Sequence, residues 1–400
     1  MSRAESVFTS VEICAGAGGQ ALGLHNAGFR HLALIEIDDN ACETLRNNVE
    51  GNPEWGGCQI LQRDLTQLSP RKLAEELDLG EGDLDLFAGG VPCPPFSAAG
   101  KQLGQDDERD LFPNALDMIE YLQPKAVMIE NVRGLLEPGH KFRDYRENVI
   151  KRRLRKAEYV ICDWRVIEAC DYGVPQLRPR AILVAMKKEY AGHFEWPNPN
   201  QIKLVTVGEA LAKSMKKRFG NSPEGKAAYM RWYEKARTGV APTLVGGSKK
   251  HGGADLGPTR AKKAWRKLGV DAMGVANEPE DMKDPKRDLY SVDKEGVPIG
   301  PKLTVSQAAI IQGFPETWKF SGRKTAAYRQ VGNAFPPLVA QAIGAQIIAA
   351  LEAGAKEPSA VPVELDEVRE TALFELPAPS VPLGAEPADR SGDLERAVVG

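Results

Sequence analysis

A cysteine held between prolines is the residue of this chain best suited to covalent chemistry. Cys93 lies in the segment GGVPCPPFS at positions 89–97, directly after an apolar run that ends at Ala88. Prolines on both sides fix the backbone, so the thiol is held on a stiff loop at the end of a strand. A structural cysteine is a small buried side chain that needs no such setting, whereas loop residues at a sheet edge face ligands. The pattern predicts that Cys93 is a nucleophile.

Acidic and basic side chains adjoin other apolar runs at positions that should share the same edge. Glu130 closes the apolar run Ala126–Glu130, and an acidic side chain is poorly suited to a core. Arg178 and Arg180 precede the run Ala181–Met186, and their alternate spacing puts both on one face of an extended segment. A thiolate beside a carboxyl group suits covalent catalysis with acid assistance.

A glycine-rich segment near the N-terminus has the pattern of a nucleotide-binding turn. Gly16 and Gly18 lie in EICAGAGGQA at positions 12–21, which follows a strand pattern and opens a helix. Glu36 stands 20 positions after Gly16, where it could accept hydrogen bonds from ribose hydroxyls. Asp64, after a short strand, could bind an adenine amino group. These residues fit a cofactor that contains adenosine, and they do not separate a nicotinamide cofactor from S-adenosylmethionine.

Such residues need a sheet to bring them together, and the first half of the chain has the pattern of one. Short apolar runs alternate with amphipathic stretches, which is typical of an α/β fold with a mainly parallel, doubly wound sheet. Each strand should end where a functional loop begins, because ligands gather at the carboxyl ends of strands. Strands are expected at Val11–Cys14, His31–Glu36, Leu84–Ala88, Ala126–Glu130, Tyr159–Ala169 and Ala181–Met186, and helices at Asn40–Asn47, Pro113–Tyr121 and Leu338–Leu351.

The pattern changes after Met186, which indicates a second domain. Residues 187–301 are rich in Gly, Pro, Lys and Arg and are expected to form a smaller inserted domain, while residues 1–186 and 302–354 form the main one. Residues 355–400 are predicted to be a disordered acidic tail. From Lys203 to Lys267 there are 16 Lys and Arg against 4 Asp and Glu, an excess that favours a polyanionic partner.

The composition restricts the class of protein. The chain has 400 residues, of which 42% are hydrophobic and 27% charged, with a net charge of -3, as in an ordinary soluble protein. We see no apolar signal core and no apolar run of membrane-spanning length, so a cytoplasmic protein without membrane contact is expected. The 6 cysteines include no Cys-x-x-Cys pair, which predicts free thiols and no metal site.

With these residues in view, the chain resembles the cytosine-5 DNA methyltransferase family. The family's motifs occur in order over about residues 7–190 and 303–350, and the basic segment occupies the place of its target-recognition domain. Ala241-Pro242-Thr243-Leu244-Val245 looks like the Thr-Leu element of that domain. The matching motifs are the glycine-rich loop, Glu36, Asp64, Pro92-Cys93, Glu130-Asn131-Val132, Gln176-x-Arg178-x-Arg180 and Gly332-Asn333.

The resemblance implies a Rossmann-like methyltransferase domain and a covalent mechanism. In the family the target cytosine is rotated out of the duplex into the pocket. By resemblance, the Cys93 thiolate adds to carbon 6 of the ring, and Glu130 hydrogen-bonds or protonates ring nitrogen 3. Arg178 and Arg180 would hold the base. Carbon 5 then takes the methyl group of S-adenosylmethionine, and loss of the proton on that carbon expels Cys93.

The resemblance also implies the cofactor and the partner. The partner would be double-stranded DNA, read by a domain that includes Thr243 and Leu244, and the enzyme would be monomeric. A companion restriction endonuclease is a further expectation that the sequence itself does not reveal. By residue-to-residue match, S-adenosylmethionine would be bound by Gly16, Gly18, Glu36, Ile37, Asp64, Leu65, Leu111 and Asn333.

Four positions depart from the family pattern, and none of them is a predicted catalytic residue. Cys14 stands where the family usually has a phenylalanine that stacks on adenine, and Pro94 replaces the glutamine that usually follows the nucleophile. Ser306-Gln307 replaces an Arg-Glu pair.

Other classes of protein explain less of the sequence. A nicotinamide oxidoreductase has no use for Cys93 paired with Glu130. An amino-methylating DNA methyltransferase carries a polar residue, two prolines and an aromatic residue where this chain has a thiol. A non-catalytic relative is disfavoured because every catalytic position is present. A tRNA methyltransferase of similar fold stays open, since charge alone does not distinguish DNA from RNA.

Overall fold

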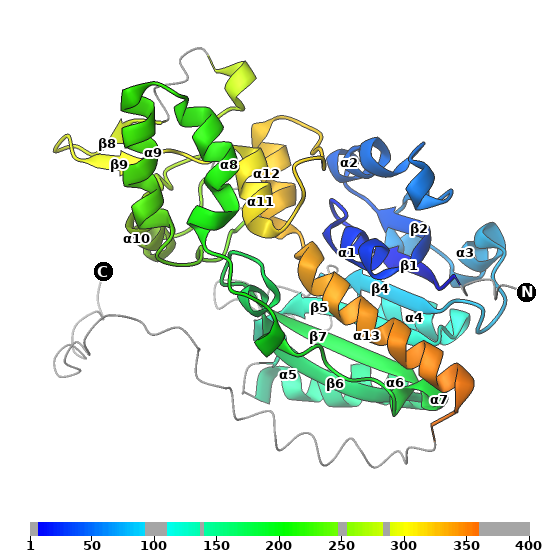
Figure 1. The fold of residues 1–400 in the computed structure, drawn as a ribbon. Coiled ribbons are helices and arrows are strands. Elements are labelled where there is room, and N and C mark those ends of the chain that lie inside the picture. The colour runs from blue at the N-terminus through cyan, green and yellow to red at the C-terminus, as the bar shows by residue number, and fades with distance from the viewer. Residues whose placement is uncertain (1–6, 93–109, 137–139, 247–253, 283–288, 360–400) are drawn as a thin grey trace, which may run out of the picture.

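The computed structural model of the chain describes residues 7–92, 110–136, 140–246, 254–282 and 289–359. They form two lobes that lie side by side (Figure 1). One lobe is a sheet with helices on both of its faces, and the other is mainly helical. Cys93 and residues 360–400, most of the predicted disordered tail, lie outside the described residues.

The sheet has seven strands in the order β3-β2-β1-β4-β5-β7-β6. Its neighbours are parallel except for the two pairs that β7 makes with β5 and β6, so the prediction of a mainly parallel α/β sheet is confirmed. All six strands with predicted bounds are present, and the short strand expected before Asp64 is β3, whose sequence, QILQ, has only two apolar residues. The strands are β1 (Thr9–Ile13), β2 (Arg30–Glu36), β3 (Gln59–Gln62), β4 (Leu86–Gly90), β5 (Ala126–Val132), β6 (Tyr159–Glu168) and β7 (Pro179–Lys187).

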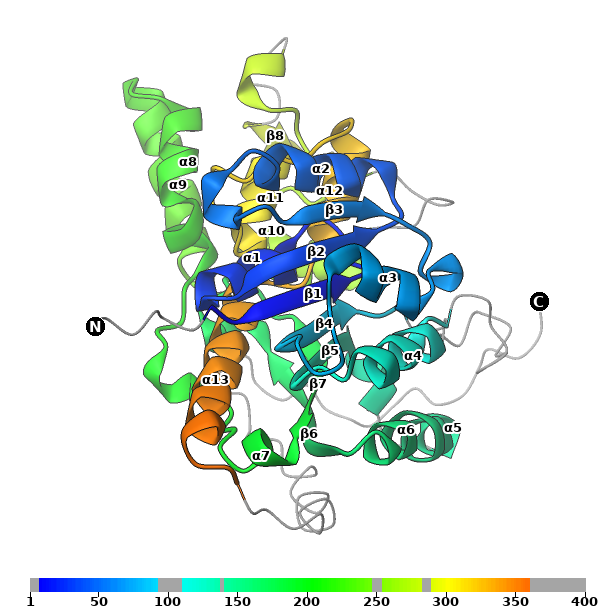
Figure 2. The same cartoon turned by 90° about the vertical axis from the view of Figure 1, so that its right-hand side faces the viewer.

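Helices cover both faces of the sheet, as Figures 1 and 2 show. On one face lie α3 (Pro70–Leu77), α4 (Phe112–Leu122), α5 (His140–Tyr145) and α6 (Arg152–Lys156), and on the other α1 (Gly19–Ala27), α7 (Lys188–Ala191) and α13 (Pro337–Lys356). The central strands are buried on both faces as a result, which explains their continuous apolar runs. The helix α2 (Asp39–Val49) lies next to β3, and α13 continues five residues beyond its predicted end at Leu351.

Glycines allow α13 to approach α1 at the level of the backbone. A Cβ on Gly23 would lie 2.8 Å from the backbone nitrogen of Gln341, and one on Gly344 would lie 2.9 Å from a methyl carbon of Leu24. The Gly23 contact is with backbone, so only glycine fits there, whereas at Gly344 the methyl end of Leu24 would have to move to make room for a Cβ. The helix α13, the last among the described residues, therefore packs closely on α1 and covers this face of the sheet.

The second lobe is built from helices whose start signals are present in the sequence. At the start of α8, the Thr206 side chain accepts a hydrogen bond from the Glu209 backbone, and the Glu209 side chain accepts one from the Thr206 backbone. Thr304 and Gln307 form the same capping box at α11. Gln307, one of the departures from the family pattern, thus has a structural role. The lobe contains α8 (Val207–Phe219), α9 (Pro223–Ala236), α10 (Thr259–Lys267), β8 (Ser291–Val292), β9 (Pro298–Gly300), α11 (Val305–Gln312) and α12 (Lys324–Asn333).

The segment 302–354, which was expected to complete the main domain, contacts elements of both lobes. Within it, α11 packs on α8 of the second lobe. Further along the same segment, α12 contacts α2 of the sheet lobe, and α13 lies along the sheet. The return segment therefore belongs to both lobes and joins them.

Among the described residues, one stretch is long and apolar enough to cross a membrane by length and composition alone. It spans Lys324–Lys356, and 61% of its most apolar window is buried within the protein. The stretch is two helices, α12 and α13, separated at Ala334–Pro336. Its apolar side chains pack against α1 and the sheet, which is the environment of a core helix.

Candidate active site

The predicted catalytic residues come from strand ends that meet at one edge of the sheet. The strands β4 and β5 are parallel, so their carboxyl ends, Gly90 and Glu130 among them, lie together. Because β7 runs antiparallel to β5, its beginning lies at that same edge, where Arg180 pairs with Val132. Arg180 therefore lies at the carboxyl ends of the parallel strands because β7 runs in the opposite direction.

Glu130 and Arg180 form an ion pair at this edge. The Arg180 Nε lies 2.7 Å from Glu130 Oε1, and the two side chains are 14% and 15% exposed. Burial raises the pKa of Glu130, while the guanidinium groups of Arg180 and Arg178 oppose that rise. The carboxyl group is thus poised to keep or share a proton more readily than a solvated glutamate.

The strand that leads to Cys93 runs directly beside this pair. A Cβ on Gly90 would lie 3.1 Å from Glu130 Oε2, so the glycine leaves room for the carboxylate. The buried amide of Asn131 donates a hydrogen bond of 2.8 Å to the Val91 carbonyl oxygen. The chain is held next to Glu130 up to Pro92, and Cys93 follows outside the described residues.

Arg178 and Leu244 are placed differently from the prediction. Arg178 is expected to hold the base together with Arg180, but its side chain is only 1% exposed and donates to backbone carbonyl groups. The side chain of Leu244 is fully buried, so it packs in the core and offers no surface to DNA. Thr243 is partly buried and donates a hydrogen bond of 2.6 Å to the Leu177 carbonyl oxygen.

The glycine-rich loop and Glu36 meet at the ends of β1 and β2. Glu36 Oε2 accepts a hydrogen bond of 2.7 Å from the backbone of Gly16, and Oε1 accepts bonds from Ile37 and Asp38. A carboxylate has about four acceptor positions, so Glu36 can still accept one from a ribose hydroxyl. Gly18 has a φ of 83°, which favours glycine, at the start of α1.

The remaining predicted cofactor residues surround this loop at the same edge. Ile37 is 60% exposed, an unusual position for an isoleucine that offers an apolar surface beside Glu36. Asp64 is exposed, and its Oδ1 accepts hydrogen bonds from Thr66 while Oδ2 takes none from the described residues. Leu65 is buried, and Leu111 is partly buried at the start of α4.

Cys14 supplies a thiol where the family has an aromatic ring. Its φ of 50° is unusual for a residue other than glycine. Burial, followed by the charges of Glu36 and Glu12, raises the pKa of its thiol to about 12. Cys14 therefore stays protonated near neutral pH and is a poor nucleophile.

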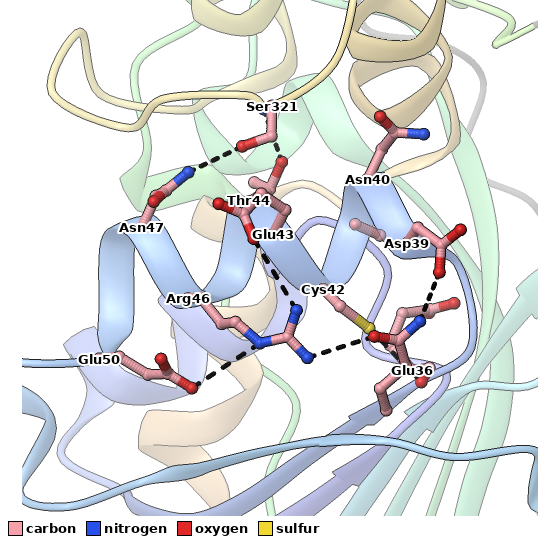
Figure 3. Close-up of polar contacts among 12 residues, drawn as sticks. Glu36, Asp39, Asn40, Cys42, Glu43, Thr44, Arg46, Asn47, Glu50 and Ser321 are labelled. Atoms are coloured by element: carbon pink, nitrogen blue, oxygen red, sulfur yellow. Dashed lines mark hydrogen bonds and ion pairs between the residues drawn. The ribbon is translucent and has the colours of Figure 1, made fainter.

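The helix α2 connects the cofactor edge to the C-terminal part of the chain (Figure 3). Asn47 donates to the Ser321 hydroxyl at 2.9 Å, and the Thr44 hydroxyl accepts from the Ser321 backbone at 2.8 Å. Thr44 also donates a bond of 2.6 Å to Gln330, in the helix that ends at Asn333. Asn333 is exposed at that helix end, as a residue that contacts a cofactor should be.

Several residues that shape the site carry no role in the prediction from sequence. Asn131 and Gln176 belong to the quoted motifs, but their backbone-holding contacts depend on segments distant in the sequence. Trp318 donates from its indole nitrogen to the Ala17 carbonyl oxygen at 3.0 Å and so supports the glycine-rich loop. No local pattern marks Trp318, since its partner is separated from it by 301 residues.

The arrangement fits an adenosine-containing cofactor beside an acid-assisted nucleophile. Glu36 and Asp64 keep acceptor capacity, Ile37 offers an apolar surface, and a Cβ on Gly16 would meet nothing within 4 Å, so the loop is open to a ligand. Among the described residues, no group of three or more His, Cys, Asp or Glu side chains could hold a metal ion.

Comparison with known proteins identifies the family. The family model for C-5 cytosine-specific DNA methylases matches residues 8–349. The chain is 49% identical to Type II methyltransferase M.NaeI of Lentzea aerocolonigenes, over 85% of this chain and 75% of that protein. It is 47% identical to Type II methyltransferase M.NgoMIV of Neisseria gonorrhoeae, over 86% of this chain and 98% of that protein.

Solved structures show the same fold at low sequence identity. The Entamoeba histolytica methyltransferase EhMeth aligns with a TM-score of 0.58 at 16% identity, over 87% of this chain and 99% of that one. Spodoptera frugiperda DNMT2 aligns with a TM-score of 0.53 at 14% identity, over 86% and 99%. The chain belongs to the C-5 cytosine-specific DNA methylase family, and it is an enzyme that transfers a methyl group from S-adenosylmethionine to carbon 5 of cytosine in DNA.

Proposed function

We propose that the enzyme methylates cytosine within a specific double-stranded sequence, through a covalent adduct that Cys93 forms with a base rotated out of the duplex. The observation that carries this proposal is the Glu130–Arg180 ion pair, which lies beside the strand leading to Cys93. A base within a duplex cannot reach a thiol and a carboxyl group at a sheet edge, so it must leave the stack.

In the proposed reaction, the Cys93 thiolate forms a bond to carbon 6 of cytosine. The electron pair released from the 5,6 double bond makes carbon 5 nucleophilic. After carbon 5 has been methylated, loss of its proton restores the double bond and breaks the bond to sulfur, which returns Cys93 as a thiolate. Sulfur thus enters and leaves without net change.

Glu130 is proposed to hold or donate a proton at ring nitrogen 3 during the attack. Its raised pKa favours the protonated form that such a role requires. Arg180 is proposed to orient Glu130 through their ion pair and to contact the base with its remaining donors. Asn131, which holds the Val91 carbonyl oxygen, is proposed to position the loop that carries the thiol.

The cofactor is proposed to lie at the adjoining strand ends. Glu36 would accept ribose hydroxyls, Asp64 would accept the adenine amino group, and Ile37 would contact the adenine ring. When bound, S-adenosylmethionine supplies the electrophilic methyl group. We propose that the other predicted cofactor residues line the same site, namely Gly16, Gly18, Leu65, Leu111 and Asn333.

We further propose that DNA lies between the two lobes and is read by the second one. We propose that Thr243 contacts the DNA, while the buried Leu244 holds this segment in place through its backbone hydrogen bonds to Gln176 and Arg178. The enzyme is proposed to act as a cytoplasmic monomer. The relatives are named Type II methyltransferases, which supports a place in a restriction-modification system with a companion endonuclease.

Bisulfite sequencing of DNA from cells that express the chain tests this function. It should return protected cytosines within one recurring sequence. The Cys93→Ser variant should fold, bind cofactor and lose transfer, because a hydroxyl is far less ionised than a thiol. Methylation by this variant at the wild-type rate would contradict the covalent mechanism.

A further inference from the structure

A buried polar junction joins four segments of the chain directly behind the Glu130–Arg180 pair. At its centre is Arg178, whose Nη1 donates to the Leu244 carbonyl oxygen at 2.8 Å. Its Nη2 donates to the carbonyl oxygens of Gly332 and Ala334 at 2.8 and 2.9 Å. One guanidinium therefore ties residues 244–246, called here the recognition segment, to residues 329–334, called the Asn333 segment.

Gln176 repeats this connection two residues earlier. It is fully buried, its Oε1 accepts a hydrogen bond of 2.7 Å from the Leu244 backbone, and its Nε2 donates to Gln312 at 2.8 Å. Gln312 in turn donates to the Ala334 carbonyl oxygen. Gln176 and Arg178, which both precede β7, therefore each connect the recognition segment to the Asn333 segment, Gln176 through Gln312 and Arg178 directly.

The segments also meet closely at two glycines, where the neighbours include backbone atoms and the side chain of Asn333. A Cβ on Gly246 would lie 2.6 Å from the Arg329 carbonyl oxygen, and a Cβ on Gly332 would lie 2.7 Å from the carbonyl carbon of Val245. Backbone packed this closely cannot shift on one side without moving the other. The recognition segment and the Asn333 segment therefore move together.

We propose that Arg178 is a positioning residue that fixes the places of the recognition segment and the Asn333 segment relative to Arg180, and that it does not contact the target base. This inference rests on the proposed function. Its side chain is 1% exposed, and all the hydrogen bonds that its guanidinium makes to described residues go to backbone carbonyl groups. Arg180, two residues away, faces Glu130 and remains the base-contacting arginine.

The two arginines can be separated by which measurements their variants change. We compare Arg178→Lys with Arg180→Lys, measuring the Kd for S-adenosylhomocysteine, the Kd for a duplex that carries the methylated sequence, and the single-turnover rate. Arg178→Lys should raise both Kd values together, each by about tenfold, because lysine cannot hold three carbonyl groups in the same geometry. Arg180→Lys should leave the Kd for S-adenosylhomocysteine unchanged and lower the rate.

A glycine pair tests the junction without altering Arg178. Gly246→Ala should reproduce the joint loss of cofactor and DNA affinity, since its Cβ would clash with Asn333 Oδ1 and lie 2.6 Å from the Arg329 carbonyl oxygen, so the two segments must separate. Gly239→Ala in the same lobe is the matched control, because its Cβ would meet only Leu268 at 3.7 Å. Thermal unfolding of each variant confirms that the protein compared is folded.

The result that would overturn the proposal is an Arg178→Lys variant with wild-type affinity for both ligands. If such a variant also loses rate as Arg180→Lys does, Arg178 contacts the base. Wild-type activity that depends on Cys93 would persist in either case, so failure of this inference is distinguishable from failure of the proposed function.

Discussion

Glu130 lies where burial and a neighbouring charge act on the same proton in opposite directions. Burial disfavours the carboxylate, and Arg180 at 2.7 Å favours it, with a net rise in the pKa of Glu130. A group in this balance can share a proton with a ring nitrogen at moderate cost. A solvated carboxylate, which is ionised near neutral pH, does not have that property.

Glu130→Gln should slow single-turnover methyl transfer by about 100-fold or more, since the amide cannot deliver a proton. Because the pKa of Glu130 is raised, the wild-type rate should fall as pH rises through that pKa, and this alkaline decline should be absent in the variant. Rates measured across a pH series test both points. Equal rates for the two proteins would remove Glu130 from the proposed mechanism.

Glu12 offers a separate test of buried charge, away from the reaction. It is 1% exposed in β1, its Oε2 has no partner among the described residues, and burial raises its pKa well above the usual value. Because the folded-state pKa of Glu12 is raised, its contribution to folding stability is fully present below the unfolded-state pKa. That contribution is lost as pH rises through the folded-state pKa. Glu12→Gln should therefore raise the free energy of unfolding on the order of 1–2 kcal/mol at about pH 8 and by less at about pH 5.

Urea unfolding at the two pH values measures this difference. The exposed Glu352 on α13 provides the control, because Glu352→Gln should change stability equally little at both pH values. A Glu12→Gln variant that is less stable than wild type at the higher pH would show that the carboxylate has a compensating partner.

What could be read from the sequence differs between the two arginines. Their alternate spacing predicts a shared face, and Arg180 does meet Glu130. The burial of Arg178 was not predictable, because its three acceptors lie at positions 244, 332 and 334, far along the chain. Spacing predicts direction along a strand, whereas the choice of partner depends on how distant segments pack.

At the scale of elements, the fit between α1 and α13 depends on glycine. Gly23→Ala should lower the free energy of unfolding by about 2–4 kcal/mol, since its Cβ would lie 2.5 Å from the Cβ of Ala340. Gly134→Ala is the matched control, because nothing lies within 4 Å of its Cβ. Denaturant midpoints of both variants measure the difference. A Gly23→Ala variant as stable as Gly134→Ala would mean that the helices separate at no cost.

Elements with strong local patterns were predictable, and those defined by neighbours were not. The apolar strands β4, β5 and β7 agree with their predicted positions to within three residues. A short strand was expected before Asp64, but the bounds of β3 depend on its pairing with β2, which its own sequence does not reveal. The helix α8 was missed although its Thr206–Glu209 capping box is present in the sequence. The antiparallel direction of β7 follows only from the assembled sheet.

At the scale of the whole molecule, net charge conceals a basic surface. Residues 360–400 contain nine acidic and three basic residues, a net -6, so the rest of the chain carries +3 against a total of -3. On α10, Arg260, Lys263 and Lys267 are exposed at spacings of one helix face. The segment predicted to meet a polyanion thus presents a row of cations.

Replacing Arg260, Lys263 and Lys267 with glutamine should weaken DNA binding at low salt and reduce its salt dependence. The slope of log affinity against log salt should fall by roughly 0.9 for each phosphate that the variant no longer neutralises. Replacing the exposed Arg152, Arg155 and Lys156 on α6 changes the net charge equally and should leave the slope unchanged. Equal slopes for both triple variants would show that α10 does not lie on the DNA.

Because α13 packs on α1, the enzyme cannot complete its fold until the end of its synthesis. Gly23 leaves the ribosome early, whereas Gly344 is translated 321 residues later, roughly tens of seconds at cellular elongation rates. Until then, the apolar side of α1 and the sheet face beneath it have no cover, and the nascent chain is open to chaperones and to aggregation. Methylation can begin only once translation is almost finished, so a truncated product would be unable to modify DNA.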